Sequence, residues 1–212
     1  MDLNTAYLYN NIFPSPNCGD FKQILTTDNA GGSSELSEAL SFMILKTMYP
    51  GVVLKWTEND INYEYIIGTP LSITDYVVEI NGYILAVSVA RAFSFSGGFT
   101  SKNAEKLVRK KINNLINSNI NAMMGSKRSL WDQQIIHFIT PSTKDADVLI
   151  TAINKVGYEG RIIITICKSN CIYSNFVDDK KDYEPKTKEF FQLRRKWLQS
   201  LNKNPKPKIK TV

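Results

Sequence analysis

Histidine and cysteine are scarce in this chain of 212 residues: His137 is the one histidine, and Cys18, Cys167 and Cys171 are the only cysteines. A lone histidine with no obvious nucleophilic partner argues against hydrolases of the Ser-His-Asp and Cys-His types. An odd number of cysteines without a CxxC pair argues against a disulfide framework and a zinc site, so we expect reduced thiols. His137 alternates with isoleucines, which favours a histidine buried in a sheet.

Long apolar runs are also lacking. No stretch of about 18 or more apolar residues exists to span a bilayer, and the opening residues, MDLNTAYLYNNIF, lack the basic start and cleavage site of a signal peptide. We therefore expect a soluble, intracellular protein, cytoplasmic or nuclear, with no membrane partner. The absence of a GxxxxGK[ST] loop argues against a phosphate-cradling nucleotide site.

The positive charge is concentrated at one end of the chain. The formal net charge is +6; residues 178–212 hold eleven Lys or Arg against five acids, whereas residues 1–177 hold 15 of each. A local basic excess is typical of a nucleic-acid contact, although a solubilising tail or a nuclear-localisation signal explains it nearly as well. The candidate nucleic-acid-binding residues here are Arg194, Arg195 and Lys196.

Composition predicts one globular domain with appendages, because 43% of the residues are hydrophobic and 22% are charged. Residues 1–32 are rich in Asn, Pro and Gly and predict an irregular N-terminal arm. Residues 33–177 predict the core, and residues 178–212 predict a basic C-terminal helix and tail.

Helical and strand patterns alternate within the core. Apolar spacing predicts helices over residues 33–49, 99–125 and 141–157, and strands over 51–60, 61–69, 74–80, 83–93, 131–140 and 161–168. In the long helix the apolar stripe runs from Ala104 through Leu115 to Ile116 and Ile120. This order predicts an α/β sandwich, with a mixed central sheet flanked by helices.

The segment TDYVVEINGYILAVSVARAF, residues 74–93, predicts a β-hairpin. An Asn-Gly pair between two β-branched runs is the strongest short-range signal for a two-residue type I′ turn. A loop of that length fixes the register, and it sets Asp75 opposite Ser88 on the same side of the sheet.

The element order resembles that of the PD-(D/E)XK phosphodiesterases, the restriction-endonuclease-like superfamily. The shared features are a helix bearing an acid, a meander with an Asp before the turn and a polar pair after it, and then helix, strand, helix and strand. The phrases SELSEALSF, TDY and AVSVARAF also resemble divergent, uncharacterised members of that fold. Over roughly Ser33 to Lys168, the resemblance implies a restriction-endonuclease-like three-layer sandwich.

The resemblance also implies a site for hydrolysing phosphodiesters. Carboxylates would hold Mg²⁺ or Mn²⁺, and a cation would lie beside the scissile phosphate. Asp75 matches the family's first Asp, and Glu38 and Glu58 are implied as further metal ligands, whereas Ser88 and Ala90 stand where the second acid and the lysine belong. The candidate catalytic residues are Asp75, Glu38, Glu58, Ser88, Arg91 and Lys106.

Two replacements for the missing lysine stay open. A β-bulge that shifts the frame by one residue would bring Val89 and Arg91 into the two slots. Alternatively, Lys106 or Lys110 would reach the site from the long helix. The basic face of that helix is either a solvated surface or a nucleic-acid contact; its candidate binding residues are Arg109, Lys110 and Lys111.

The sequence therefore leaves two functions of this fold open, beside a purely structural interaction module that binds neither metal nor nucleic acid. The first is a divergent metal-dependent nuclease-like domain that acts on nucleic acid phosphodiesters. The alternative is a catalytically inactive member of the same fold that binds nucleic acid or protein, because Ser88 and Ala90 cannot replace an acid and a lysine. A simple structural role for Asp75, as a side chain that bonds nearby backbone amides, competes with both.

Overall fold

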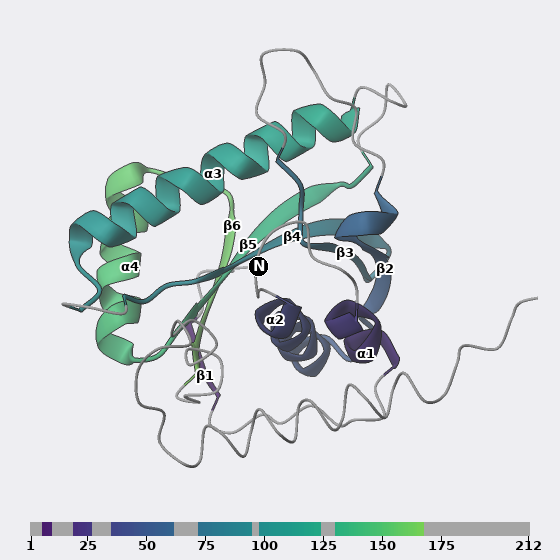
Figure 1. The fold of residues 1–212 in the computed structure, drawn as a ribbon, viewed down its shortest axis with the longest axis horizontal. Coiled ribbons are helices and arrows are strands. Elements are labelled where there is room, and N and C mark those ends of the chain that lie inside the picture. The colour runs from purple at the N-terminus through teal and green to yellow at the C-terminus, as the bar shows by residue number, and fades with distance from the viewer. Residues whose placement is uncertain are drawn as a thin grey trace, which may run out of the picture. The chain divides into compact units, whose positions relative to one another are not determined.

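A six-stranded sheet, with strand order β1-β6-β5-β4-β3-β2, lies at the centre of the computed structural model (Figure 1). The structure describes residues 6–9, 19–26, 35–61, 72–94, 98–123 and 130–167, all of which belong to the unit Met1–Ser169. An antiparallel meander is formed by β2 (Val53–Thr57), β3 (Tyr76–Ile80) and β4 (Tyr83–Arg91). The sheet then continues from β4 with parallel pairing through β5 (Gln133–Thr140), β6 (Arg161–Cys167) and β1 (Ala6–Tyr9). The mixed α/β architecture expected from the sequence is confirmed.

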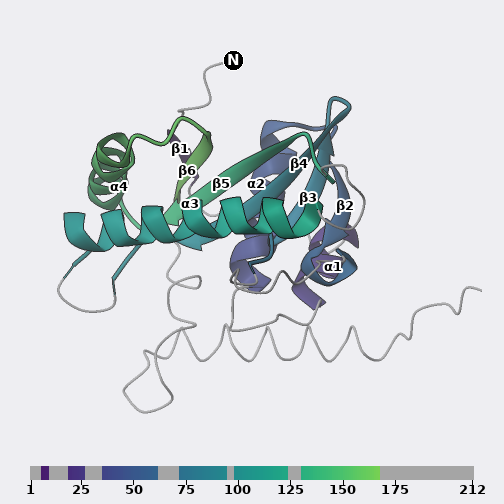
Figure 2. The ribbon, with the colours of Figure 1, turned by 90° about the horizontal axis from the view of Figure 1, so that it is seen from above.

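Helices cover both faces of this sheet (Figures 1 and 2). On one side lie α1 (Gly19–Thr26) and α2 (Glu35–Met48), and on the other lie α3 (Ser101–Met123) and α4 (Thr143–Val156). The connections β4-α3-β5 and β5-α4-β6 both join neighbouring parallel strands, and a right-handed crossover places both helices on the same face. Among the helices that the structure describes, none is long and apolar enough to cross a membrane.

Alternation along the strands divides the core between the two faces. Even-numbered residues of β4, β5 and β6 pack with α3 and α4 in one cluster, which includes Ala90, Phe138, Ile164, Val108 and Leu149. Odd-numbered residues point toward α2, where the buried His137 is hydrogen-bonded to Ser41. The face on which a strand residue lies therefore decides which helices it can contact.

The predicted β3–β4 hairpin is confirmed in both its turn and its register. Asn81 and Gly82 have φ values of 52° and 83°, the positive values that a type I′ turn requires. Pairing runs without a shift from Ile80 and Tyr83 at the turn to Tyr76 and Val87.

The paired part of the hairpin, from Ile80 and Tyr83 to Tyr76 and Val87, contains no bulge of the kind that would bring Val89 and Arg91 into the catalytic slots. The register shift in this part of the sheet lies instead between β2 and β3, at Leu54 and Trp56. Strand alternation places Arg91 on the opposite face of β4 from Ser88, and three residues span about 10 Å along a strand.

Two further expectations are corrected by the structure. Residues 1–32 are not wholly irregular, because β1 pairs with β6 and α1 packs beside α2. In α3, Ile116 and Ile120 are 50% and 39% exposed, whereas Ser118 and Asn121 are buried. The strand expected over residues 61–69, apart from Ile61, and the tail expected over residues 178–212 lie outside the described residues.

Helix α4 is capped at both ends, and its C-terminal cap supplies a test of the fold. The Ser142 hydroxyl accepts a hydrogen bond from the Asp145 amide at 3.1 Å, while Gly157, at φ 70°, donates to the Ile153 carbonyl at 3.0 Å. A Cβ at Gly157 would meet nothing within 4 Å, so the cost of a side chain there is confined to the backbone conformation.

We expect Gly157→Ala to lower the free energy of unfolding by about 1 kcal/mol, because alanine is strained in the left-handed region. Gly157→Asn is the matched control and should lose less than half of that, since asparagine tolerates this conformation. Urea unfolding at pH 7 measures both variants. Equal losses would contradict the assignment of the effect to backbone strain.

Candidate functional site

The polar cluster best suited to chemistry lies just before the start of β3, where the longer β4 runs past it. The Val89 amide, two residues past the last β3–β4 pair, donates to Asp75 Oδ2, a side-chain oxygen, in place of a strand carbonyl. The Asp75 amide and the Thr74 hydroxyl both donate to the Val87 carbonyl, at 3.1 Å and 2.9 Å. Asp75 thus closes the end of the hairpin, and its side chain bonds a backbone amide, as the structural interpretation of this residue expects.

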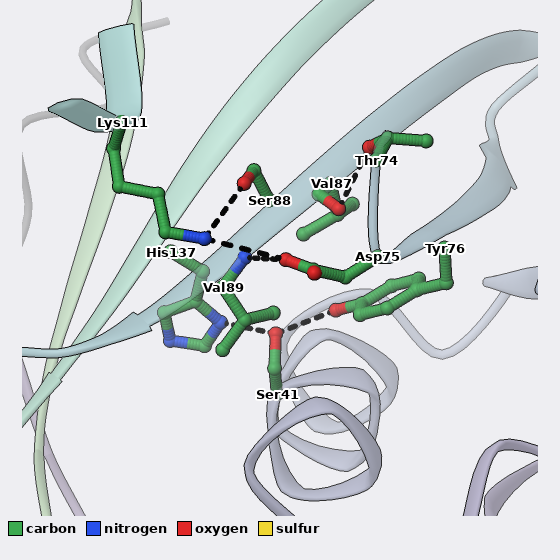
Figure 3. A network of polar contacts seen from close by, with 9 residues as sticks. All are labelled: Ser41, Thr74, Asp75, Tyr76, Val87, Ser88, Val89, Lys111 and His137. Carbon is green, nitrogen blue, oxygen red and sulfur yellow. Dashed lines mark hydrogen bonds and ion pairs between the residues drawn. The ribbon is translucent and has the colours of Figure 1, made fainter. Parts of the chain in front are cut away.

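Lys111 reaches the same carboxylate from helix α3 (Figure 3). Its Nζ donates to Ser88 Oγ at 3.1 Å and lies 3.7 Å from Asp75 Oδ2. The Asp75 and Lys111 side chains are each 17% exposed, so water screens this pair less than it screens a surface ion pair. The Val89 amide and the Lys111 ammonium group both meet Oδ2, which leaves Oδ1 outside these two contacts.

The position of Lys111 is encoded in the helical periodicity, although residue types alone do not reveal it. Lys111 follows Ala104 by seven residues, Leu107 by four and Val108 by three, so it falls on the face of α3 that packs on the sheet. A lysine in that apolar stripe needs a polar or acidic partner beside the core, because its ammonium group is partly removed from water. The periodicity of the helix therefore distinguishes Lys111 from its basic neighbours.

The cations expected from the sequence do not occupy the site. Lys106 lies on the outer side of α3, where it lines a groove together with Lys155, so its expected place beside Asp75 is wrong. Lys110 is exposed. Arg91, on the opposite face of β4, is also excluded as the cation beside Ser88.

Glu58 directly follows β2, and Asp75 directly precedes β3, the strand with which β2 pairs. The short helix η1 (Glu58–Asp60) directly follows β2, whose last pair with β3 joins Thr57 to Tyr76. Glu58 and Asp75 are thus each one residue beyond this last pair, Glu58 in η1 and Asp75 just before β3. Glu58 is only 6% exposed, so a second buried carboxylate lies near the same end of the meander.

Glu38 approaches from α2 and is 4% exposed. The pKa of the Tyr76 hydroxyl is raised well above its usual value, mainly by burial; the Ser41 hydrogen bond opposes this, and the charges of Asp75 and Glu38 add to it. Both carboxylates therefore act on one hydroxyl. Within the described ranges, however, no three His, Cys, Asp or Glu side chains gather as a metal centre, so Asp75, Glu38 and Glu58 form no ready-made set of three.

A second polar network is sealed under α2. Ser41 Oγ is hydrogen-bonded to Tyr76 OH at 2.5 Å and to His137 Nδ1 at 2.7 Å, and His137 Nε2 is bonded to Thr165 Oγ1 at 2.8 Å (Figure 3 shows the first three residues). All four residues are fully buried. The pKa of His137 falls to about 3 because burial disfavours its charged form. The expectation of a satisfied sheet histidine is confirmed, and this network is structural.

The remaining candidates from the sequence are dispersed. Arg109 is exposed and its guanidinium is 3.0 Å from Glu105, while Lys110 is exposed and Lys111 turns to the sheet. Cys167 is a buried free thiol. The candidates Arg194, Arg195 and Lys196 lie outside the described residues, as do Cys18 and Cys171.

Comparison with known proteins finds a relative in Dictyostelium discoideum. The chain is 37% identical over 164 residues to the AAC-rich mRNA clone AAC4 protein of Dictyostelium discoideum. That alignment covers 74% of this chain but 23% of the relative, so the chain spans about a quarter of the curated relative that it matches. No family model and no solved structure matches the chain.

The buried His137 predicts a specific dependence of stability on pH. Its pKa is about 3 in the folded chain and about 6.5 in an unfolded one. Below pH 6.5 the unfolded state therefore binds a proton that the folded state does not, and the free energy of unfolding should fall by about 1.4 kcal/mol per pH unit down to about pH 3. Urea unfolding at pH 7, 6 and 5 measures this slope.

The control for this prediction is His137→Gln, which retains a hydrogen-bonding side chain but does not titrate. The variant should be less stable at pH 7, because its amide fits the Ser41 and Thr165 hydroxyls less well. Its loss of stability between pH 7 and pH 5 should be smaller than that of the wild type. Parallel pH profiles would show that His137 is not the titrating group.

Proposed function

We propose that this chain is a divergent restriction-endonuclease-like domain that hydrolyses nucleic acid phosphodiesters at Asp75, with Lys111 as the cation of the site. The observation that carries the proposal is the position of Lys111 Nζ, 3.1 Å from Ser88 Oγ and 3.7 Å from Asp75 Oδ2. It supplies a cation beside the two hairpin positions that the family resemblance selects. The order α2, β2, β3, β4, α3, β5, α4 and β6 supports the same assignment.

The roles of the two side chains follow from their charge and burial. Phosphodiester hydrolysis builds negative charge on the phosphate oxygens, and a fixed cation lowers the energy of that state. Lys111 is held between Ser88 and Asp75, so its ammonium group is placed before a substrate arrives. Ser88 cannot carry the charge of an acid; its contribution is to accept a hydrogen bond from Lys111 and orient it.

A Mg²⁺ ion suits the carboxylates beside the start of β3. Mg²⁺ is commonly held by one or two carboxylates together with substrate phosphates, rather than by a complete protein cage. Asp75 Oδ1 lies outside the contacts with Val89 and Lys111, and Glu58 and Asp75 are each one residue beyond the last β2–β3 pair, Thr57 with Tyr76. Asp75 and Glu58 would hold the ion, which when bound polarises the phosphate and lowers the pKa of a water molecule.

A second candidate function is a binding module without catalysis. The observation that favours it is that Asp75 Oδ2 already accepts from the Val89 amide and faces Lys111, which is a complete structural role. Ser88 in place of an acid supports the same interpretation. In this case the cluster stabilises the hairpin end, and nucleic acid or protein binds without being cleaved.

Cleavage assays with Asp75→Asn and Lys111→Met separate these functions. Asparagine keeps an acceptor for the Val89 amide but removes the charge, so the hairpin should stay closed while turnover falls roughly 100- to 1,000-fold. Lys111→Met keeps the length of the side chain and should lose a similar factor. The assay uses labelled single- and double-stranded DNA and RNA with Mg²⁺ or Mn²⁺, at saturating protein and without added metal as a blank.

Lys110→Met is the matched control, because this lysine is adjacent in sequence but exposed. It should retain the wild-type rate of turnover. Divalent-dependent cleavage that persists in Asp75→Asn would remove the site assignment. Binding of nucleic acid without cleavage by the wild type would favour the binding module instead.

A further inference from the structure

Helix α3 packs beside α4 (Figures 1 and 2). A basic groove lies on the outer side of α3 at this contact. Its volume is about 520 Å³, and its lining residues are Ser101, Lys102, Glu105, Lys106, Arg109 and Lys155. Four cations thus surround one carboxylate, which leaves a net charge of +3. Lys155 comes from α4 and the other three cations from α3, so the groove exists only because the two helices pack together.

Glu105 organises the two sides of this groove. Its Oε1 accepts from Arg109 at 3.0 Å and 3.2 Å, and its Oε2 accepts from Lys155 at 2.7 Å. The pKa of the Glu105 carboxyl is lowered, first by the hydrogen bond from Lys155 and then by that from Arg109. One anion therefore holds a cation from each helix in place, with the other two lysines beside them.

The surplus charge is unfavourable for the chain alone. Lys102 and Lys106 are four residues apart on one helix, where like charges repel. Lys102, Lys106 and Arg109 follow one line along α3, and seven residues of helix span about 10 Å. A polyanion with regularly spaced charges would relieve this repulsion, whereas a single small anion would neutralise only part of the line.

We propose that the α3–α4 groove binds the phosphate backbone of nucleic acid, with Lys102, Lys106, Arg109 and Lys155 as its contacts. The substrate class rests on the proposed function, but the binding does not require the reaction. The groove lies on the outer side of α3, while Lys111 turns from the same helix to Ser88 on the sheet. The groove therefore contributes affinity and position, and the reaction centre contributes turnover.

The salt dependence of binding tests the groove directly. Fluorescence anisotropy with the full chain and a labelled 20-nucleotide strand or duplex gives the dissociation constant between 50 and 200 mM KCl. Removing one cation that neutralises a phosphate should reduce the slope of log affinity against log salt by about 0.7 for a single strand or 0.9 for a duplex. We expect the double variant Lys102→Gln/Lys106→Gln to reduce the slope by about twice this amount, and the single variant Lys155→Gln to reduce it by about this amount once.

Lys144→Gln is the control, because Lys144 is exposed at the opposite end of α4 from Lys155. It should leave the slope unchanged. A slope that is unchanged in the groove variants would overturn the proposal. Polyglutamate tests the nature of the occupant. If it binds as tightly as nucleic acid, and only its binding disappears in the groove variants, the assignment of nucleic acid to the groove is overturned.

The groove and the reaction centre can fail separately in these measurements. Asp75→Asn should keep the wild-type salt slope while turnover falls, whereas the groove variants should reduce the salt slope. A chain that never cleaves, but whose slope falls in the groove variants, would disprove the nuclease proposal and support the groove. If the chain cleaves nucleic acid and the groove variants leave the salt slope unchanged, the nuclease proposal is supported and the groove proposal is disproved.

Discussion

An unpaired strand end is the constraint on which the candidate site depends. Strand β4 runs past the start of β3, and the amide of Val89 there bonds to a side chain instead of a neighbouring strand. A buried amide needs an acceptor, and Asp75 supplies one. The carboxylate is then largely out of water, which favours a cation nearby; Lys111 meets this need from α3, with Ser88 as its second partner. Backbone geometry thus places an acid, a cation and a hydroxyl together.

The two faces of the sheet hold polar groups of different kinds. Under α2, the hydroxyls of Ser41, Tyr76 and Thr165 satisfy a neutral His137 in a fully buried network. Such a network fixes the helix on the sheet but cannot meet a substrate. Under α3, Asp75 and Lys111 are charged and partly exposed. Accessibility, more than the presence of polar groups, identifies the second cluster as the candidate site.

Local patterns predicted most of the fold and half of the site. The Asn-Gly turn fixed the hairpin register as far as Tyr76 and Val87, because a two-residue loop leaves one pairing; Asp75 and Ser88, one residue further on, both contact Lys111. Strand β1 was missed because its four residues pair with β6, which lies more than 150 residues later, and no local pattern encodes such a partner. Lys106 or Lys110 was expected at the site, but the rotation of α3 turns Lys111 toward the sheet instead, and residue type alone does not distinguish these lysines.

The nuclease and binding interpretations share the groove and differ at Asp75. A crystal structure with Mn²⁺ and an oligonucleotide carrying a non-hydrolysable phosphorothioate link tests that difference most directly, because anomalous scattering locates the metal. If Asp75 and Lys111 form the reaction centre, a Mn²⁺ peak will lie at the Asp75 carboxylate, with a phosphate oxygen within hydrogen-bonding distance of Lys111 Nζ. A bound oligonucleotide with no metal at Asp75, and with Lys111 still directed only to Ser88 and Asp75, would contradict the nuclease assignment.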